Sequence, residues 1–536
     1  MFESGNYYRK HVSTANAAKL TIKNAHMKKD ASTMQPTETE LKLALLARDA
    51  AALRQLLAAL PLLARGKPAE LQLHNIYYDT AEQTLRRQGL ALRLRRVDGG
   101  AQPRWLQTLK IGASGHSALS QRGEWETEVS SAELSWPALK NTPWSDIDPD
   151  GDLFRQLAPV FETRFDRTSW TVHKAGGNTA EVSLDVGQIV VEGKTAPLCE
   201  LELELKAGQS AALFSLARQI ARRVATLPEH RSKAERGYAL ADATLNQPLR
   251  ARPPALGASI KPLDAAQCVL REMLCQFTAN LDALRQSDDP ELLHQARVGW
   301  RRFRSAHRLF RPLPGVDTAP SWKPLQTLLT LVGELRDMDV ARTETLPRFA
   351  EAYAAGDAGR LEKWQALMRA LTQAAALQRK AVVDALEAPK VGATLLALTQ
   401  WLEELPQGQR PHQGDDGAVA DQKTSFRRWS RRRIDRLHRR LKSALQQALQ
   451  EADSAESQHR VRILAKRLRY GIEALQPLLP KRRGARWLSR ANALQKTIGA
   501  ARDMTQANLL LARLDADSEL AGFLRGVAAG QAAKSV

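Results

Sequence analysis

Residues 38–42 read Glu-Thr-Glu-Leu-Lys, and this stretch decides how the first half of the chain is interpreted. Because side chains alternate between the two faces of a β-strand, Glu38, Glu40 and Lys42 would share one face and Leu41 would lie on the other. Two carboxylates and an amine make a poor hydrophobic surface, but they can hold a divalent cation and an anion side by side. The stretch therefore predicts a strand with one apolar face and one charged, ligand-binding face.

The same alternation recurs in later strands. Leu92-Arg93-Leu94-Arg95 places two guanidiniums on one face, and 199–206 (Cys-Glu-Leu-Glu-Leu-Glu-Leu-Lys) places three carboxylates opposite three leucines. The further predicted strands are 71–79, 90–96, 104–111, 123–129, 167–173, 180–185, 188–191 and 199–206, with helical stretches at 45–63 and 210–227. Many antiparallel strands with few helices indicate a closed or nearly closed sheet.

Two arrangements fit this pattern. If the leucine faces pack outward under helices, the charged faces line the lumen of a barrel. The alternative is an open sheet with a leucine core and a solvated charged face. Acids and bases lie on separate strands, as a site for metal and phosphate requires, and this segregation favours the barrel.

Length and charge set the wider limits. The chain has 536 residues, more than one core usually carries, and a formal net charge of +21, which suggests a polyanionic partner. Three cysteines without zinc-type spacing fit a reducing compartment. We find no apolar run of the ~18 residues that a membrane span needs and no signal peptide, so we expect a cytoplasmic protein without a membrane partner.

Composition also divides the chain. We expect a disordered leader at 1–33, a strand-rich domain at 34–245, a proline-rich linker at 246–262 and a helical domain at 263–530. The helical domain contains an internal repeat, since the basic helix that begins at His294 recurs at His459 with an offset of 165 residues. Two tandem bundles of about four helices, near 263–400 and 422–530, are the economical interpretation.

Each copy of the repeat carries a stripe of bases along one helix face, because the bases recur at three- and four-residue spacing. The first stripe is His294, Arg297, Arg301, Arg304 and Arg308, and the second is His459, Arg462, Lys466 and Arg469. Like charges at this spacing destabilise a helix by a few tenths of a kcal/mol per pair. We therefore expect an anionic ligand that offsets this repulsion. Aromatics are only 5% of the chain, too few for the stacking platforms of a single-strand binder. Inorganic polyphosphate is therefore favoured over nucleic acid.

The first half of the chain resembles the CYTH domain of the triphosphate tunnel metalloenzymes. The matching pieces are Glu38-x-Glu40-x-Lys42, Tyr77-Tyr78-Asp79-Thr80, Leu92-Arg93-Leu94-Arg95, Thr108-x-Lys110, Arg122-x-Glu124, Arg167 before Trp170, Leu184-Asp185, Glu200-x-Glu202-x-Glu204 and Ser232-Lys233-x-x-Arg236-Gly237. The second half resembles the CHAD domain, a helical domain with repeated histidine, through the two basic stripes. The tandem order is similar to that of bacterial inorganic triphosphatases.

The resemblance implies an α+β chain: an eight-stranded antiparallel tunnel that binds triphosphate and a divalent metal, followed by an all-α domain that binds polyphosphate. Mapped onto this pattern, the metal ligands would be Glu40, Glu124, Asp185, Glu202 and Glu204, with Mg²⁺ or Mn²⁺ as the metal because both prefer oxygen ligands. The catalytic group would be Glu38, Glu40, Glu124 and Lys42. The phosphate-binding bases would be Lys42, Arg93, Arg95, Lys110, Arg122, Arg167, Lys233 and Arg236.

The implied activity is hydrolysis of inorganic triphosphate to diphosphate and phosphate by water attack. The alternatives are a non-catalytic polyphosphate-binding protein, a class IV-like adenylate cyclase and a thiamine triphosphatase. The helical half could feed polyphosphate to the tunnel or attach the protein to polyphosphate granules, and the sequence does not separate these roles.

Overall fold

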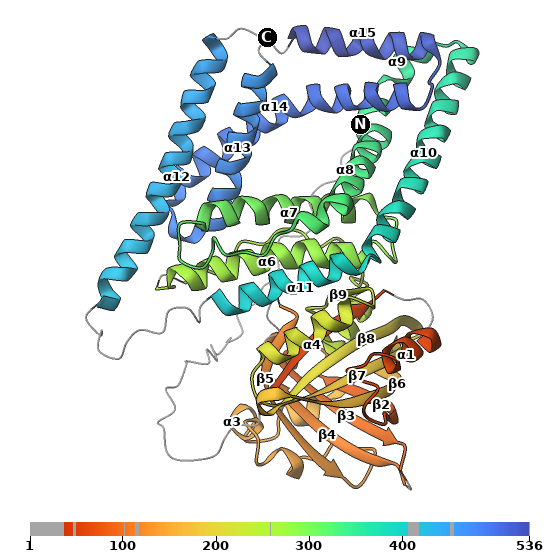
Figure 1. The fold of residues 1–536 in the computed structure, drawn as a ribbon, viewed down its shortest axis with the longest axis vertical. Helices are drawn as coiled ribbons and strands as arrows, with labels where there is room; N and C mark the ends of the chain where they lie inside the picture. Colours follow the sequence, from red (N-terminus) through yellow and green to blue (C-terminus); the bar gives the residue numbers. More distant parts are fainter. Residues whose placement is uncertain are drawn as a thin grey trace. The chain divides into compact units, whose positions relative to one another are not determined.

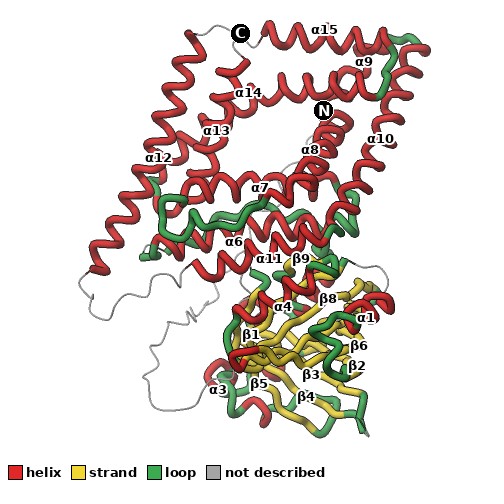
Figure 2. Tube along the Cα trace, viewed as in Figure 1, coloured by secondary structure: helices red, strands yellow, loops and turns green. Residues whose placement is uncertain are grey.

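The computed structural model describes residues 37–46, 50–100, 102–112, 117–257, 259–405, 418–450 and 455–534. The predicted leader at 1–33 lies outside these ranges. Strands belong to the first half, whereas the described residues beyond Pro262 form helices and loops (Figure 2). Within the described helices, none combines the length and the apolarity that crossing a bilayer demands.

Eight antiparallel strands close into a barrel (Figure 1). They are β1 (Thr37–Leu45), β2 (Ala69–Asp79), β3 (Leu90–Asp98), β4 (Arg104–Ile111), β5 (Leu119–Val129), β6 (Ala158–Lys174), β7 (Asn178–Val191) and β8 (Lys194–Ala207). The order is β5-β4-β3-β2-β6-β7-β8-β1, and β1 pairs back onto β5. Closure leaves these strands without a free edge. The predicted fold class is confirmed.

The leucine faces of the strands point outward. Leu41 and Leu43 of β1 and Leu201 and Leu203 of β8 are fully buried and share a core with residues of α1 (Ala50–Ala58) and α4 (Ala211–Ala221). Since neighbouring side chains alternate, the charged residues between these leucines face the barrel interior. The open-sheet alternative is therefore wrong.

Two local predictions were also wrong. The stretches 180–185 and 188–191 are one continuous strand, β7, because Gly187 lets the chain pass close to β6. A Cβ at Gly187 would lie 2.1 Å from the carbonyl oxygen of Arg164. The predicted helix at 210–227 ends at Ala221, and Thr226–Pro228 forms a short strand, β9, because it pairs with the end of β1. That pairing depends on partners 181 to 185 positions away in the sequence, which local propensity does not report.

Small helices complete the barrel half: α2 (Thr84–Arg87), α3 (Trp144–Ile147) and α5 (Lys233–Ala241). The helical half contains α6 (Pro262–Ala283), α7 (Pro290–Phe310), α8 (Gln326–Val340), α9 (Ala350–Ala354), α10 (Ala358–Leu386), α11 (Pro389–Glu404), α12 (Ala418–Gln450), α13 (Ala455–Leu475), α14 (Lys481–Arg513) and α15 (Ser518–Lys534). The two helices that bear the basic stripes, α7 and α13, are both 21 residues long and pack against each other.

Candidate functional site

One ion network fills the part of the barrel interior formed by β1, β4 and β5. The ammonium of Lys110 lies 2.7 Å from a carboxylate oxygen of Glu38 and 3.0 Å from one of Glu124. Arg122 also bridges Glu38, at 3.1 Å, and Glu40. The strand register explains this convergence, since Glu38 is paired with Arg122 across β1 and β5, and Lys110 with Glu124 across β4 and β5.

A second network joins β6, β7, β8 and α5. Arg167 contacts Asp185 at 2.7 Å and Glu202 at 2.6 Å. The ammonium of Lys233 lies 2.6 Å from Asp185, 2.9 Å from Glu202 and in contact with Glu200. Lys233 reaches this point because Ser232 and Glu235 form a capping box that starts α5 there.

Glu40 and Lys42 connect the two networks, because their side chains lie 2.6 Å apart and Lys42 is paired with Glu202 in the strand register. Burial alone would raise the pKa of Glu40, but Lys42 and Arg122 hold it below the usual value. Burial acts on Glu202 in the same way, and Lys233 and Arg167 bring the pKa of Glu202 well below its usual range. Both groups are therefore carboxylates at neutral pH.

The two guanidiniums of β3 differ in their partners. Arg93 faces Glu124 at 3.5 Å and Glu126 at 3.8 Å. Arg95 donates a 2.8 Å hydrogen bond to Asn75, and no carboxylate of the described residues lies within ion-pair distance of it. Burial first, and then Arg93 and Arg167, lower the pKa of Arg95 to about 10. An inward guanidinium with this environment has the electrostatics of an anion-binding group.

The structure gathers nearly all the barrel residues that the sequence selected, with one exception. Glu204 lies at a more exposed position and pairs with Lys206 at 2.7 Å. Sequence reasoning also missed two carboxylates, Glu126 and Glu200. Glu200 is fully buried and is held by Lys233 and Arg236. Glu126 and Glu200 each lie on the same inward strand face as residues that the sequence selected. Strand alternation could therefore have identified both.

The donors fit a divalent cation. Asp185, Glu200 and Glu202 each offer a carboxylate oxygen, and these oxygens lie within 4.8 Å of one another. The ammonium of Lys233 lies among them, so this group already has the chemistry of a cation site. Within this group, Lys233 and Arg167 keep the pKa of Glu202 low so that it stays ionised, whereas burial raises the pKa of Glu200.

Both basic stripes are present on their helices. In the first stripe, Arg304 and Arg308 are exposed, and His294, Arg297 and Arg301 are half-buried. In the second, His459 is exposed, and Arg462, Lys466 and Arg469 are half-buried. Burial, followed by Arg308 of α7 and Arg440 of α12, lowers the pKa of Arg467 on α13. Bases from both copies of the repeat therefore lie near one another.

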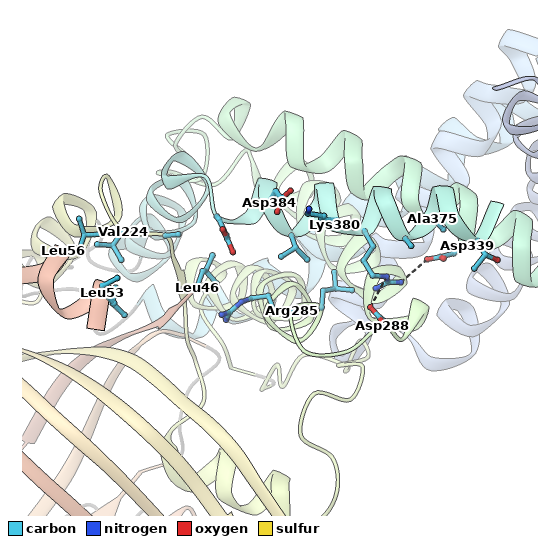
Figure 3. A pocket seen from close by; sticks show the side chains of 18 of the residues that line it. Leu46, Leu53, Leu56, Val224, Arg285, Asp288, Asp339, Ala375, Lys380 and Asp384 are labelled. Carbon is cyan, nitrogen blue, oxygen red and sulfur yellow. Dashed lines mark ion pairs between the residues drawn. The ribbon is translucent and has the colours of Figure 1, made fainter. Parts of the chain in front are cut away.

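A pocket of about 1030 Å³ lies outside the barrel interior, lined by residues of α1, α8 and α10 and of the loops after β1, α4 and α6 (Figure 3). Its polar wall includes Asp339, which is fully buried and lies 3.9 Å from Arg379. Arg379 also contacts Asp288 at 3.5 Å. None of the predicted metal- or phosphate-binding residues lines this pocket. Pocket size alone therefore does not locate the converging acids and bases.

Comparisons with known proteins match two successive parts of the chain. A model of the CYTH domain matches residues 36–238, and a model of the CHAD domain matches residues 268–512. An inorganic triphosphatase of Haemophilus influenzae is 33% identical over 211 residues, which is 38% of this chain and 54% of that protein. The chain thus matches about half the length of this curated relative.

Two solved structures are also similar. The CHAD domain from the plant Ricinus communis is 30% identical, with a TM-score of 0.44, and the match covers 54% of this chain and 92% of that one. HpAC1 from Hippeastrum, described as having a dominant triphosphatase activity, is 20% identical, with a TM-score of 0.29, and the match covers 38% of this chain and 95% of that one.

Proposed function

The chain carries a CYTH domain followed by a CHAD domain, and from this we propose that its barrel hydrolyses inorganic triphosphate to diphosphate and phosphate with the help of Mg²⁺ or Mn²⁺. The observation that carries the proposal is the convergence of acids and bases on the interior of one closed barrel. The inorganic triphosphatase of H. influenzae supports the choice of substrate.

The charges of the interior fit a metal–triphosphate complex. The bases of the two networks and β3 are Lys42, Arg93, Arg95, Lys110, Arg122, Arg167, Lys233 and Arg236. The carboxylates they face are Glu38, Glu40, Glu124, Glu126, Asp185, Glu200 and Glu202. Among these residues are eight bases and seven carboxylates, so a highly charged anion gains most when a cation enters with it.

Each group then has a role in the proposal. The inward bases hold the phosphate oxygens, and Arg93, Arg122 and Arg167 can do so with two nitrogens at once. Glu40, Glu124, Asp185 and Glu202 are the candidate metal ligands, to which the geometry adds Glu200. Glu204 would join them only by leaving Lys206. A bound Mg²⁺ or Mn²⁺ would neutralise charge on the phosphoryl group during its transfer. Glu38 and Glu124 accept hydrogen bonds from Lys110 and can orient the attacking water, while Lys42 keeps Glu40 ionised.

The test is a substrate panel. The wild-type chain, supplied with each metal in turn, is expected to release phosphate from inorganic triphosphate faster than from thiamine triphosphate or ATP, without forming cyclic AMP. A clear preference for thiamine triphosphate, or cyclic AMP formation from ATP, would replace the proposed substrate.

Arg95 gives a pH-dependent prediction for substrate binding. A base whose pKa is about 10 is charged at neutral pH and loses its charge as the pH rises through that value. We therefore expect triphosphate affinity, measured by calorimetry without metal, to weaken above about pH 10. Arg95→Gln should bind more weakly at pH 8 and show a smaller further loss at high pH. Arg164→Gln, which removes an exposed guanidinium paired with Glu162, is the control and should match the wild type.

We also propose that the helical half binds inorganic polyphosphate along the two stripes. Charge reversal at two exposed positions of the first stripe, Arg304→Glu with Arg308→Glu, should weaken polyphosphate binding about tenfold or more and reduce its dependence on salt. The matched control, Arg348→Glu with Arg513→Glu, makes the same charge change outside the stripes and should leave the affinity near that of the wild type. Equal losses in the two double variants would mean that net charge, rather than the stripes, determines binding.

A further inference from the structure

The helical half contributes to the end of the barrel at which β1 finishes. Leu46, which follows β1, and Leu227 of β9 are buried in the same apolar core as Leu281 and Leu284 at the end of α6. The backbone of the neighbouring helix, α11, also lies close to that of β9, since a Cβ at Gly392 would lie 2.3 Å from the carbonyl oxygen of Thr226. These contacts place the last turn of α6 against two segments that lead into the barrel interior.

Asp282, in that last turn, ties the two segments together. One of its carboxylate oxygens accepts a 2.9 Å hydrogen bond from Arg285, and Arg285 in turn donates a 3.1 Å hydrogen bond to the carbonyl oxygen of Leu45 in β1. The other oxygen of Asp282 lies 3.5 Å from the guanidinium of Arg231, in the loop between β9 and α5. A single carboxylate of the helical half therefore contacts both segments, directly or through one arginine.

Both segments carry groups of the candidate site. β1 bears Glu40 and Lys42, and the loop leads directly to Lys233. The loop is also bonded to β1, because the backbone N–H of Glu229 donates to the carbonyl oxygen of Lys42 at 3.0 Å. The buried carboxylate of Glu229 accepts a 2.8 Å hydrogen bond from the backbone N–H of Arg231. Arg231 is thus held by Glu229 on the barrel side and by Asp282 on the helical side.

We propose that Asp282 and Arg231 are positioning residues of the barrel site, through which the helical half fixes the placement of Lys233 relative to the acids of β1. Catalytic groups must be held within about 0.5 Å of their working positions, and a displacement of about 1 Å can cost on the order of 100-fold in rate. The inference rests on the proposed triphosphatase activity and assigns the helical half a role separate from polyphosphate binding.

The experiment uses the full chain and the variants Asp282→Ala, Arg231→Ala, their combination and Asp282→Glu. Asp282→Ala and Arg231→Ala should each lower kcat/KM for triphosphate about tenfold, mainly through kcat. The thermal unfolding midpoint should stay near that of the wild type in Asp282→Ala, whereas Arg231→Ala also removes a partner of the buried Glu229 and should lower it. The double variant should be little worse than either single one, because the two residues act through one contact. Asp282→Glu should recover part of the loss. Asp264→Ala removes a carboxylate from the first turn of the same helix and should change kcat/KM less than twofold.

A second readout does not depend on turnover. Hydrogen exchange of peptides covering 226–232 should be faster in Asp282→Ala than in Asp264→Ala, because the bond from Glu229 to Lys42 opens more often. If exchange is faster in Asp282→Ala but the wild type hydrolyses no triphosphate, the positioning role stands and the proposed activity is rejected. Unchanged exchange, or additive losses of kcat/KM in the double variant, would overturn the positioning role itself.

Discussion

Glu40→Gln should lower kcat for triphosphate hydrolysis by about 10²-fold or more, in line with the loss of one strong electrostatic contributor from other active sites. Glu40 is only 2% exposed, and Lys42 and Arg122 keep it ionised. Glutamine preserves the size of the side chain but removes the charge that would hold a metal. Steady-state phosphate release at saturating metal measures the effect.

The control for Glu40→Gln is Glu162→Gln. Glu162 is also a carboxylate on a barrel strand with basic partners, but it lies at a more exposed place, beside His74 and Arg164. This variant should keep kcat within about twofold of the wild type. If Glu40→Gln retained comparable turnover while remaining folded, Glu40 would be a structural ion-pair partner and the metal site would have to lie elsewhere.

Lys233→Met should destabilise the chain by about 3–5 kcal/mol, the usual cost of removing one partner from a buried ion pair. Asp185 and Glu200 are fully buried, and Glu202 is largely so, and all three lose their shared ammonium. Denaturant unfolding followed by circular dichroism measures the change. Because the three carboxylate oxygens lie within 4.8 Å of one another, millimolar Mn²⁺ should restore part of the lost stability.

Lys206→Met is the matched control for Lys233→Met. Lys206 also pairs with a glutamate of β8, but its side chain is 43% exposed, and exposed pairs contribute about 0–1 kcal/mol. Equal destabilisation by the two variants, or no response of Lys233→Met to Mn²⁺, would contradict the assignment of the three carboxylates as a cation site.

The fold and the inward charged faces were predictable because strand alternation is a local signal. In β8 glutamates and leucines alternate over 200–205, and in β1 the charged Glu40 and Lys42 alternate with Leu41 and Leu43. Deciding which face points inward then needed only a closed sheet. The repeat of the helical half was predictable for a similar reason, since α7 and α13 have the same length and begin 165 residues apart, at Pro290 and Ala455.

Which residues belong to the site was harder to predict than the fold. Glu200, Glu202 and Glu204 share one face of β8, and local sequence treats them alike. Their environments are set by partners from distant segments: Lys233 of α5 contacts the first two, whereas Glu204 pairs with the neighbouring Lys206. The contact between Asp282 and Arg231 joins residues 51 positions apart in the two halves of the chain, and no periodicity reports such a contact.

We propose that the inward carboxylates and bases bind a metal and a triphosphate together in the barrel. Phosphate release by the wild-type chain from inorganic triphosphate, compared with and without Mg²⁺ or Mn²⁺, tests it most directly. Each triphosphate should yield one phosphate and one diphosphate, and chelation of the metal should stop the reaction. Absence of turnover with either metal, or turnover unaffected by chelation, would contradict it.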